Sequence, residues 1–153
     1  TEWLMWYTSG IKLWNDNNGH LKSLYDVKTA KSTDGKNWKK TGKSAIELGD
    51  RTTNIARACV QRIESGFRAW YPYVDREKSG YLSGYGESED GQYFNRLDQS
   101  EKAMILPDTQ SCWHSNEVTY PHVFNIGNRM YMLFNGDEFG KTGFGIAEWI
   151  GND

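Results

Sequence analysis

Short runs of aromatic and apolar residues recur along the chain, separated by turn-forming residues. Three of these runs are similar to one another: WLMWYTSG at 3–10, FRAWYPYV at 67–74 and RMYMLFNG at 129–136. Runs of this length and character, bounded by Gly, Asp, Asn and Ser, are typical of β-strands. No segment has the 3.6-residue apolar period of an amphipathic helix. The pattern therefore predicts an all-β protein.

A second stretch is also repeated, and it contains a hairpin. YDVKTAKSTDGKNW at 25–38 aligns with YLSGYGESEDGQYF at 81–94, and a shorter copy, TGFGIAEW, lies at 142–149. In the two longer copies an Asp-Gly pair stands where a tight hairpin needs a residue with positive φ. Each copy therefore predicts a strand that follows an aromatic strand.

A third repeat completes the unit. RACVQRIESGFRAWY, from Arg57, aligns without a gap with YPHVFNIGNRMYMLF, from Tyr120, which predicts an inner strand before each of these two aromatic strands. One unit is then a four-stranded antiparallel sheet, and such sheets repeated around an axis are the blades of a β-propeller. We expect blades at about 1–50, 54–110 and 117–151, the first without its inner strand and the last without its outer strand.

The predicted fold is thus a β-propeller fragment of about three four-stranded antiparallel blades, forming a single partial domain over 1–153. Propellers typically close with about four to eight blades. Exposed sheet edges pair readily with other chains. We therefore expect either half of a longer propeller or a homo-oligomer whose chains complete the ring.

Composition excludes some classes of function. The 153-residue chain has a net charge of −2, which argues against a nucleic-acid partner bound through phosphates. It has no apolar run of about 18 residues, so no membrane span is expected. Its three histidines and two cysteines lack the spacing of a metal site, and no cofactor motif is present, so we expect neither metal nor cofactor. The compartment is not indicated.

The motifs MWYTSG, ARACV, AWYPY, GYGESEDG, NEVTYPHVF and MYMLFNGDEFGKTGFGIAEW resemble the five-bladed propeller clan of glycoside hydrolase family 43, which includes arabinanases, β-xylosidases, invertases and levansucrases. The resemblance covers essentially the whole chain but only the C-terminal half of such a propeller. It implies a carbohydrate partner and three carboxylates at the channel mouth: a general base, a helper and a general acid.

Glu117, in SNEVTYPHVF, occupies the position where the resembling family places its general acid. Arg57 stands at the start of an inner strand, where it could orient a carboxylate or hold an anionic group of the substrate. The sequence departs from the family here, because several members have Arg-Asp-Pro where this chain has Arg57-Ala58-Cys59. A plain surface glutamate and an outward salt bridge are the alternatives for Glu117 and Arg57.

Three further residues are candidates for substrate binding. Strand alternation places Tyr120 and His122 on the same side of an inner strand, where His122 could bind a sugar hydroxyl or be a structural histidine. Trp113, in the loop before Glu117, could stack on a sugar ring. Asp137 and Glu138, in NGDEFG, are expected to form a solvated turn.

The sequence therefore predicts a glycoside-hydrolase-like propeller that binds or hydrolyses a glycosidic substrate at a central channel. With only one of the required carboxylates, the isolated chain is expected to be inactive. The alternatives are a non-catalytic module that binds a glycan or a protein, and a self-assembling half-propeller without activity.

Overall fold

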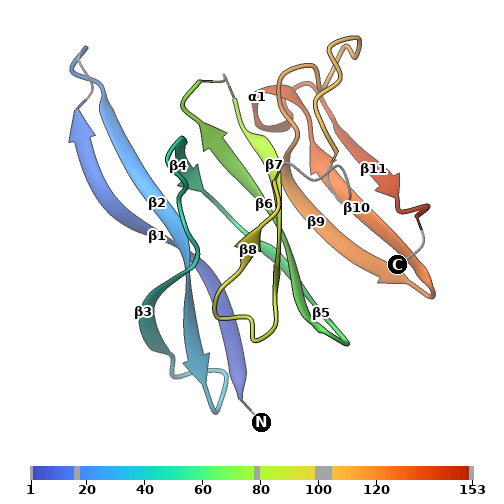
Figure 1. The fold of residues 1–153 in the computed structure, drawn as a ribbon. Helices are drawn as coiled ribbons and strands as arrows, with labels where there is room; N and C mark the ends of the chain where they lie inside the picture. Colours follow the sequence, from blue (N-terminus) through green and yellow to red (C-terminus); the bar gives the residue numbers. More distant parts are fainter. Residues whose placement is uncertain (1, 16–17, 78–79, 99–104, 152–153) are drawn as a thin grey trace.

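The computed structural model describes residues 2–15, 18–77, 80–98 and 105–151. Its described part is almost entirely β-structure, arranged in an eight-stranded sheet and a three-stranded sheet. Figure 1 shows the strands as three groups that follow one another from the N-terminus to the C-terminus. The predicted all-β propeller fragment is confirmed.

The first group, blade one, consists of β1 (Trp3–Asn15), β2 (Leu21–Ser32) and β3 (Lys39–Ile46). Both pairs of neighbouring strands are antiparallel, in the order β1-β2-β3. Trp6 of β1 pairs with Thr29 of β2. The described residues of blade one thus form the aromatic, third and outer strands of the repeated unit.

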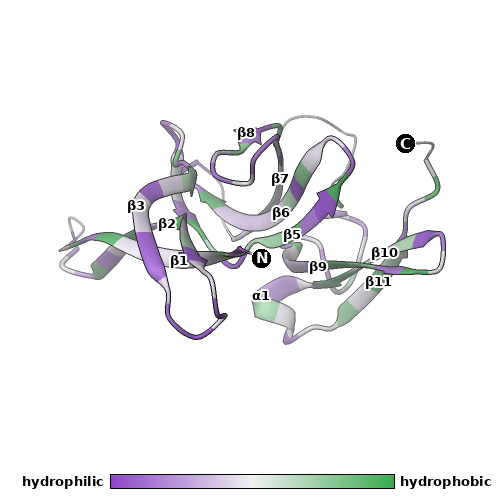
Figure 2. Ribbon diagram, turned by 90° about the horizontal axis from the view of Figure 1, so that it is seen from below, coloured by the Kyte–Doolittle hydropathy of each residue, from purple (hydrophilic) through white to green (hydrophobic). Residues whose placement is uncertain are grey.

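Blade two consists of β5 (Cys59–Ile63), β6 (Gly66–Asp75), β7 (Leu82–Ser88) and the short β8 (Asn95–Arg96). These strands are antiparallel in chain order, which gives the complete four-stranded unit. Blade three consists of β9 (Thr119–Ile126), β10 (Arg129–Asn135) and β11 (Phe144–Glu148). It forms the separate three-stranded sheet that Figure 2 shows side by side with the larger one.

One strand was not predicted. β4 (Thr52–Ile55) pairs antiparallel with β6 and, at Asn54, parallel with Tyr25 of β2. It joins blades one and two into one sheet. The four-residue α1 (Asp137–Gly140) lies between β10 and β11, and two of its residues have left-handed rather than helical backbone angles.

The two Asp-Gly hairpins have the same local structure. Gly35 and Gly91 both have φ of +72°, which glycine adopts without the steric cost of a side chain. The hydroxyl of Ser32 accepts a hydrogen bond from the N–H of Gly35 at 2.9 Å, and Ser88 does the same for Gly91 at 2.9 Å. The repeated sequence therefore specifies a repeated turn.

Neighbouring blades pack through apolar side chains. Between blades one and two lies a fully buried cluster: Val27, Ala45, Ile46, Ile55, Ala69, Tyr71 and Phe94. A smaller cluster, Trp70, Tyr85 and Val123, joins blades two and three. Aromatic side chains thus contribute to both contacts between blades, as β-sheet packing favours.

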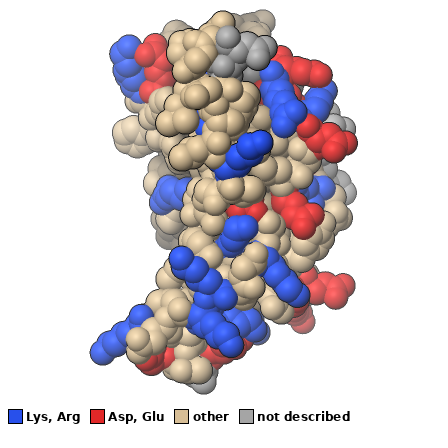
Figure 3. Space-filling view, turned by 90° about the vertical axis from the view of Figure 1, so that its left-hand side faces the viewer, with Lys and Arg blue, Asp and Glu red and all other residues tan. Residues whose placement is uncertain are grey.

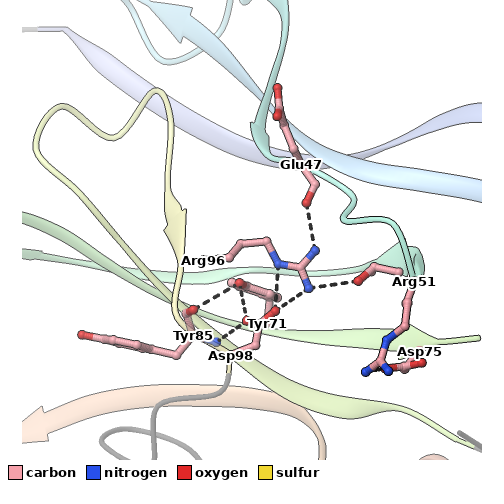
Figure 4. Close-up of polar contacts among 8 residues, drawn as sticks. Glu47, Arg51, Tyr71, Asp75, Tyr85, Arg96 and Asp98 are labelled. Atoms are coloured by element: carbon pink, nitrogen blue, oxygen red, sulfur yellow. Dashed lines mark hydrogen bonds and ion pairs between the residues drawn. The ribbon is translucent and has the colours of Figure 1, made fainter. Parts of the chain in front are cut away.

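A polar network also joins blades one and two (Figure 4). The guanidinium of Arg96 donates to the Asp98 carboxylate from Nε at 2.8 Å, to the Glu47 carbonyl at 3.0 Å and to the Thr52 hydroxyl at 3.1 Å. Asp98 also accepts the hydroxyl proton of Tyr71 at 2.6 Å. We call these residues the Arg96–Asp98 network.

The outer edges of the fragment differ in chemistry. β3 carries Lys39, Lys40 and Lys43, and charged side chains of this kind discourage edge pairing. Figure 3 shows Lys and Arg side chains over the face of blade one. β11, in contrast, exposes Phe144 and Ile146. Among the described residues no helix is long and apolar enough to cross a membrane.

Candidate functional site

Glu117 lies at the point where blades two and three meet, directly before β9. Its side chain is buried, with 8% of the residue exposed. One carboxylate oxygen accepts the backbone N–H of Tyr81 at 3.1 Å, and the other accepts the N–H of Phe139 at 3.2 Å. The carboxylate therefore bridges a segment of blade two and the turn that follows β10.

Asp137 positions the segment that carries Glu117. Its carboxylate accepts the N–H groups of Ser115 at 3.1 Å, Asn116 at 2.8 Å and Glu117 at 2.8 Å, and also the Ser115 hydroxyl at 2.8 Å. Burial favours a higher pKa for Asp137, but the hydrogen bonds from Asn116, Glu117 and Ser115 outweigh it and lower the pKa from 3.8 to about 2. Asp137 lies in a turn, as expected, and its carboxylate also holds the 115–117 segment in place.

A pocket of about 470 Å³ opens beside Glu117. That volume is within the roughly 300–1,000 Å³ typical of small-molecule sites. Its lining comprises one glycine, one phenylalanine and five polar or charged residues: Gly80, Asn116, Glu117, Asp137, Glu138, Phe139 and Thr142. A Cβ atom on Gly80, whose φ is +79°, would lie 2.5 Å from Cγ of Glu117. Only glycine permits this close approach.

Aromatic rings adjoin the pocket. The Phe139 ring lies 5.7 Å from that of Tyr81 and 6.3 Å from that of Tyr120, and the two tyrosine rings are 6.3 Å apart. The Tyr81 hydroxyl is hydrogen-bonded to that of Tyr25, from blade one. Burial, followed by the hydrogen bond with Tyr25, raises the pKa of Tyr81 well above its usual value, so this phenol stays protonated. All three blades thus contribute to this region.

Tyr120 was predicted to bind substrate, and the structure places it next to Glu117. Its φ is +52°, and the β9–β10 register shifts between Leu133 and Asn135 nearby. Burial and the nearby Tyr25 and Glu117 raise its pKa, and the charge of Arg57 partly offsets this effect. Arg57 therefore acts electrostatically on the same region, and its own backbone N–H donates to the Thr8 hydroxyl at 3.1 Å.

The other two candidates have contacts elsewhere. His122 lies on β9, with its ring stacked 6.0 Å from Phe124 and its Nδ1 4.0 Å from Sγ of Cys59 on β5. The alternation of exposure along β9 is consistent with Tyr120 and His122 sharing a face. However, His122 is not among the residues that line the Glu117 pocket.

Trp113 is committed to packing within blade three. Its ring stacks on Phe134 at 5.4 Å, and Cβ atoms on Gly136 and Gly145 would lie 2.7 Å and 2.5 Å from it. Its carbonyl accepts hydrogen bonds from the N–H of Asp137 and the hydroxyl of Thr142. The structure therefore gives the ring a structural role and does not bring it into the pocket.

Sequence reasoning missed Gly80, Tyr81 and Phe139. Two of them contact Glu117 through backbone N–H groups, which leave no signature in a sequence. Among the described residues, no group of three or more His, Cys, Asp or Glu side chains is arranged to hold a metal ion.

Comparisons with known proteins agree with this fold. No family model matches the chain. Two uncharacterized Mycobacterium tuberculosis proteins, MT1551 from strain CDC 1551 and Rv1502 from strain H37Rv, are 31% and 30% identical over 144 residues. The match covers 94% of this chain but only 45% of each relative, so the chain spans less than half their length.

Two solved structures of similar fold are glycoside hydrolases by title. One is a glycoside hydrolase, with a TM-score of 0.65 and 16% identity, of which the chain covers 40%. Another is a Bombyx mori GH32 beta-fructofuranosidase, with a TM-score of 0.63 and 16% identity, of which it covers 31%. The alignments cover 95% and 98% of this chain. At this identity they establish the fold, which is that of a glycoside-hydrolase-like propeller.

Proposed function

We propose that the chain is a carbohydrate-binding part of a glycoside-hydrolase-like propeller, with Glu117 as its central polar residue. The observation that carries the proposal is a buried carboxylate at the start of an inner strand, facing a pocket with aromatic rings beside it. We also propose that the protein belongs to the family 43 clan, on the basis of the motifs around Glu117 and Phe144.

The hydrogen bonding of Glu117 is compatible with sugar recognition. A carboxylate offers about four acceptor positions. Backbone N–H groups of Tyr81 and Phe139 use one on each oxygen, so a second remains on each for a sugar hydroxyl. In a complete catalytic site, the protonated form of Glu117 would donate its proton to the leaving oxygen of the glycoside.

Hydrolysis requires a second carboxylate, at roughly 6.5–9.5 Å in inverting enzymes. The other two carboxylates that line the pocket have different partners. Asp137 binds the 115–117 segment, and Glu138 pairs with Lys141 at 2.6 Å. We therefore propose that the 153-residue chain alone binds a glycan without hydrolysing it, and that a longer protein or a second copy supplies the missing group.

Calorimetric titration of the chain with arabino-, xylo- and fructo-oligosaccharides tests the proposal. Replacing a charged acceptor costs about 1.5–3 kcal/mol, so Glu117→Gln should weaken binding by about 10- to 150-fold. Glu64→Gln changes an exposed glutamate in the β5–β6 turn and serves as the control. No binding of any of these glycans, or equal binding by wild type and E117Q, would refute the proposal.

A non-catalytic glycan- or protein-binding module is the second candidate. It is favoured by Ala58, which stands directly before β5 where a catalytic helper would be expected. Turnover of aryl glycosides by a longer natural protein, lost on Glu117→Gln, would exclude it.

A further inference from the structure

Phe139 is an exposed aromatic residue held in a strained conformation. It is 56% exposed, and it follows Glu138 in a turn where both residues have left-handed backbone angles: φ 52° and ψ 47° for Glu138, φ 60° and ψ 28° for Phe139. Side chains disfavour this region, which glycine occupies freely. Strain of this kind concentrates at functional sites, so its presence motivates a functional hypothesis.

The surrounding structure holds the turn in place. The N–H of Phe139 donates to Glu117, and its carbonyl accepts the side-chain amide of Asn135 at 3.1 Å. The N–H of Gly140 donates to the Gly136 carbonyl at 3.0 Å. These bonds hold the backbone from which the Phe139 side chain projects. The conformation therefore presents this ring at the pocket instead of burying it.

Among the described residues that line the pocket, Phe139 is the one aromatic residue. The rings of Tyr81 and Tyr120 lie beside it, with centroids 5.7 Å and 6.3 Å away, and neither residue is in the lining. The remaining side chains of the lining are polar or charged. A ligand that matches such a wall needs one apolar face and polar groups around its rim, and a pyranose ring has this shape.

The charges in the lining restrict the class of sugar further. Among the described residues, the pocket lining includes three acidic residues, Glu117, Asp137 and Glu138, and no Lys or Arg. Lys141 is paired with Glu138, and Arg57, whose charge affects Tyr120, lies outside the lining. A like charge in the ligand would be repelled at these distances. The pocket therefore disfavours uronic acids and sugar phosphates.

We propose that Phe139 is a substrate-stacking residue, on which the apolar face of an uncharged pyranose packs while its hydroxyls reach Glu117. This inference rests on the proposed carbohydrate-binding function. It adds the residue that makes the apolar contact and the charge class of the ligand.

The test uses methyl β-glucoside, methyl β-xyloside and methyl β-galactoside, with methyl β-glucuronide as the charged counterpart of the glucoside. Saturation-transfer NMR on the wild-type chain should show contact between ring protons of at least one neutral glycoside and the protein. Phe139→Ala should weaken that binding by about tenfold. Phe139→Trp should retain it. The glucuronide should bind more weakly than the glucoside.

Two further variants separate the contact from folding. Phe139→Leu keeps apolar bulk in the same turn but lacks the flat face, so it should bind as weakly as F139A with an unchanged melting temperature. Phe144→Ala removes a phenylalanine that is 75% exposed on β11 and should bind like wild type.

The outcomes distinguish this inference from the proposed function. Binding that depends on Glu117 but is unchanged in F139A and F139L overturns the stacking role and leaves the function standing. Tighter binding of the glucuronide overturns the assignment of an uncharged ligand. Failure of every neutral glycan to bind the wild-type chain overturns the proposed function and the inference together.

Discussion

Removing the Asp98 carboxylate should destabilise the contact between blades one and two more than any other single polar change in the Arg96–Asp98 network. Asp98 accepts hydrogen bonds from the Tyr71 hydroxyl at 2.6 Å, the Tyr85 N–H at 3.1 Å and the Arg96 guanidinium. In Asp98→Ala, Arg96 keeps only the Glu47 carbonyl and the Thr52 hydroxyl among its partners shown in Figure 4.

The magnitude follows from which groups are left unpaired. Breaking a buried ion pair by removing one partner costs about 3–5 kcal/mol. Since the Arg96 side chain is 19% exposed, we expect about 3 kcal/mol for Asp98→Ala. Tyr71→Phe removes one fully buried hydroxyl but leaves Asp98 with Tyr85 and Arg96, so it should cost only about 1–2 kcal/mol.

Urea unfolding followed by tryptophan fluorescence measures the loss of unfolding free energy in each variant. The comparison holds if the slope of this free energy against urea concentration is the same in all variants. Glu89→Ala, at an exposed turn position, is the control and should stay within about 0.5 kcal/mol of wild type. If D98A lost no more stability than Y71F, the network would contribute little, and the apolar cluster around Tyr71 would be what holds the blades together.

Three further predictions concern the pocket, acid stability and assembly. Gly80→Ala should displace Glu117, because the new Cβ would lie 2.5 Å from its Cγ, and glycan titration should show binding lost in a folded chain. Because the Asp137 pKa is lowered from 3.8 to about 2, its contribution to stability should be complete above pH 4 and disappear as the pH falls toward 2. When the free energy of unfolding is measured in urea at pH 5 and at pH 2.5, Asp137→Asn should therefore lose less of it between the two pH values than wild type does. An equal loss would contradict this. If the exposed β11 edge joins two copies, light scattering should show a dimer that Ile146→Pro dissociates, because in the β10–β11 register the N–H of Ile146 points away from β10. An unchanged mass would exclude that contact.

The blades could be predicted because their signals are local and repeated. Ser-x-Asp-Gly specifies its own turn through bonds within four residues, and Gly35 and Gly91 adopt the same φ. β4 could not be predicted, because it is four residues long and is defined by pairing with β2 and β6 rather than by its own pattern.

The candidate site was only partly predictable, because its contacts also join segments that are far apart in the sequence. Glu117 became a candidate through its motif, and Tyr120 through its alternation with His122 on the predicted inner strand. Trp113 shows what the sequence could not predict. A tryptophan near a site has the same sequence signature whether its ring is exposed or packed in the interior. The distinguishing signal was Gly136 and Gly145, which leave space for its ring. Phe139 was missed because its left-handed backbone, normally a property of glycine, has no sequence pattern of its own.

The Glu117 carboxylate joins the segment at Tyr81 to the turn at Phe139, and this connection makes a final prediction. In Glu117→Gln one of the two carboxylate oxygens becomes an NH₂ donor, which cannot accept the N–H of Tyr81 or of Phe139. One of these two bonds must therefore be lost, at about 1–2 kcal/mol. If the amide oxygen stays with Tyr81, the strained turn loses the bond that anchors Phe139.

Backbone amide exchange measured by NMR distinguishes the two arrangements. Faster exchange at Phe139 in E117Q, with Tyr81 unchanged, would mean that the carboxylate positions the exposed ring as well as binding the ligand. The reverse result would show that the turn is held by Asn135 and Gly136 alone. Unchanged exchange at both amides would contradict the bridging role of Glu117. If exchange is faster only at Phe139, the losses of binding free energy in E117Q and F139A should not be additive in the double variant. Residues that act through one contact are not independent.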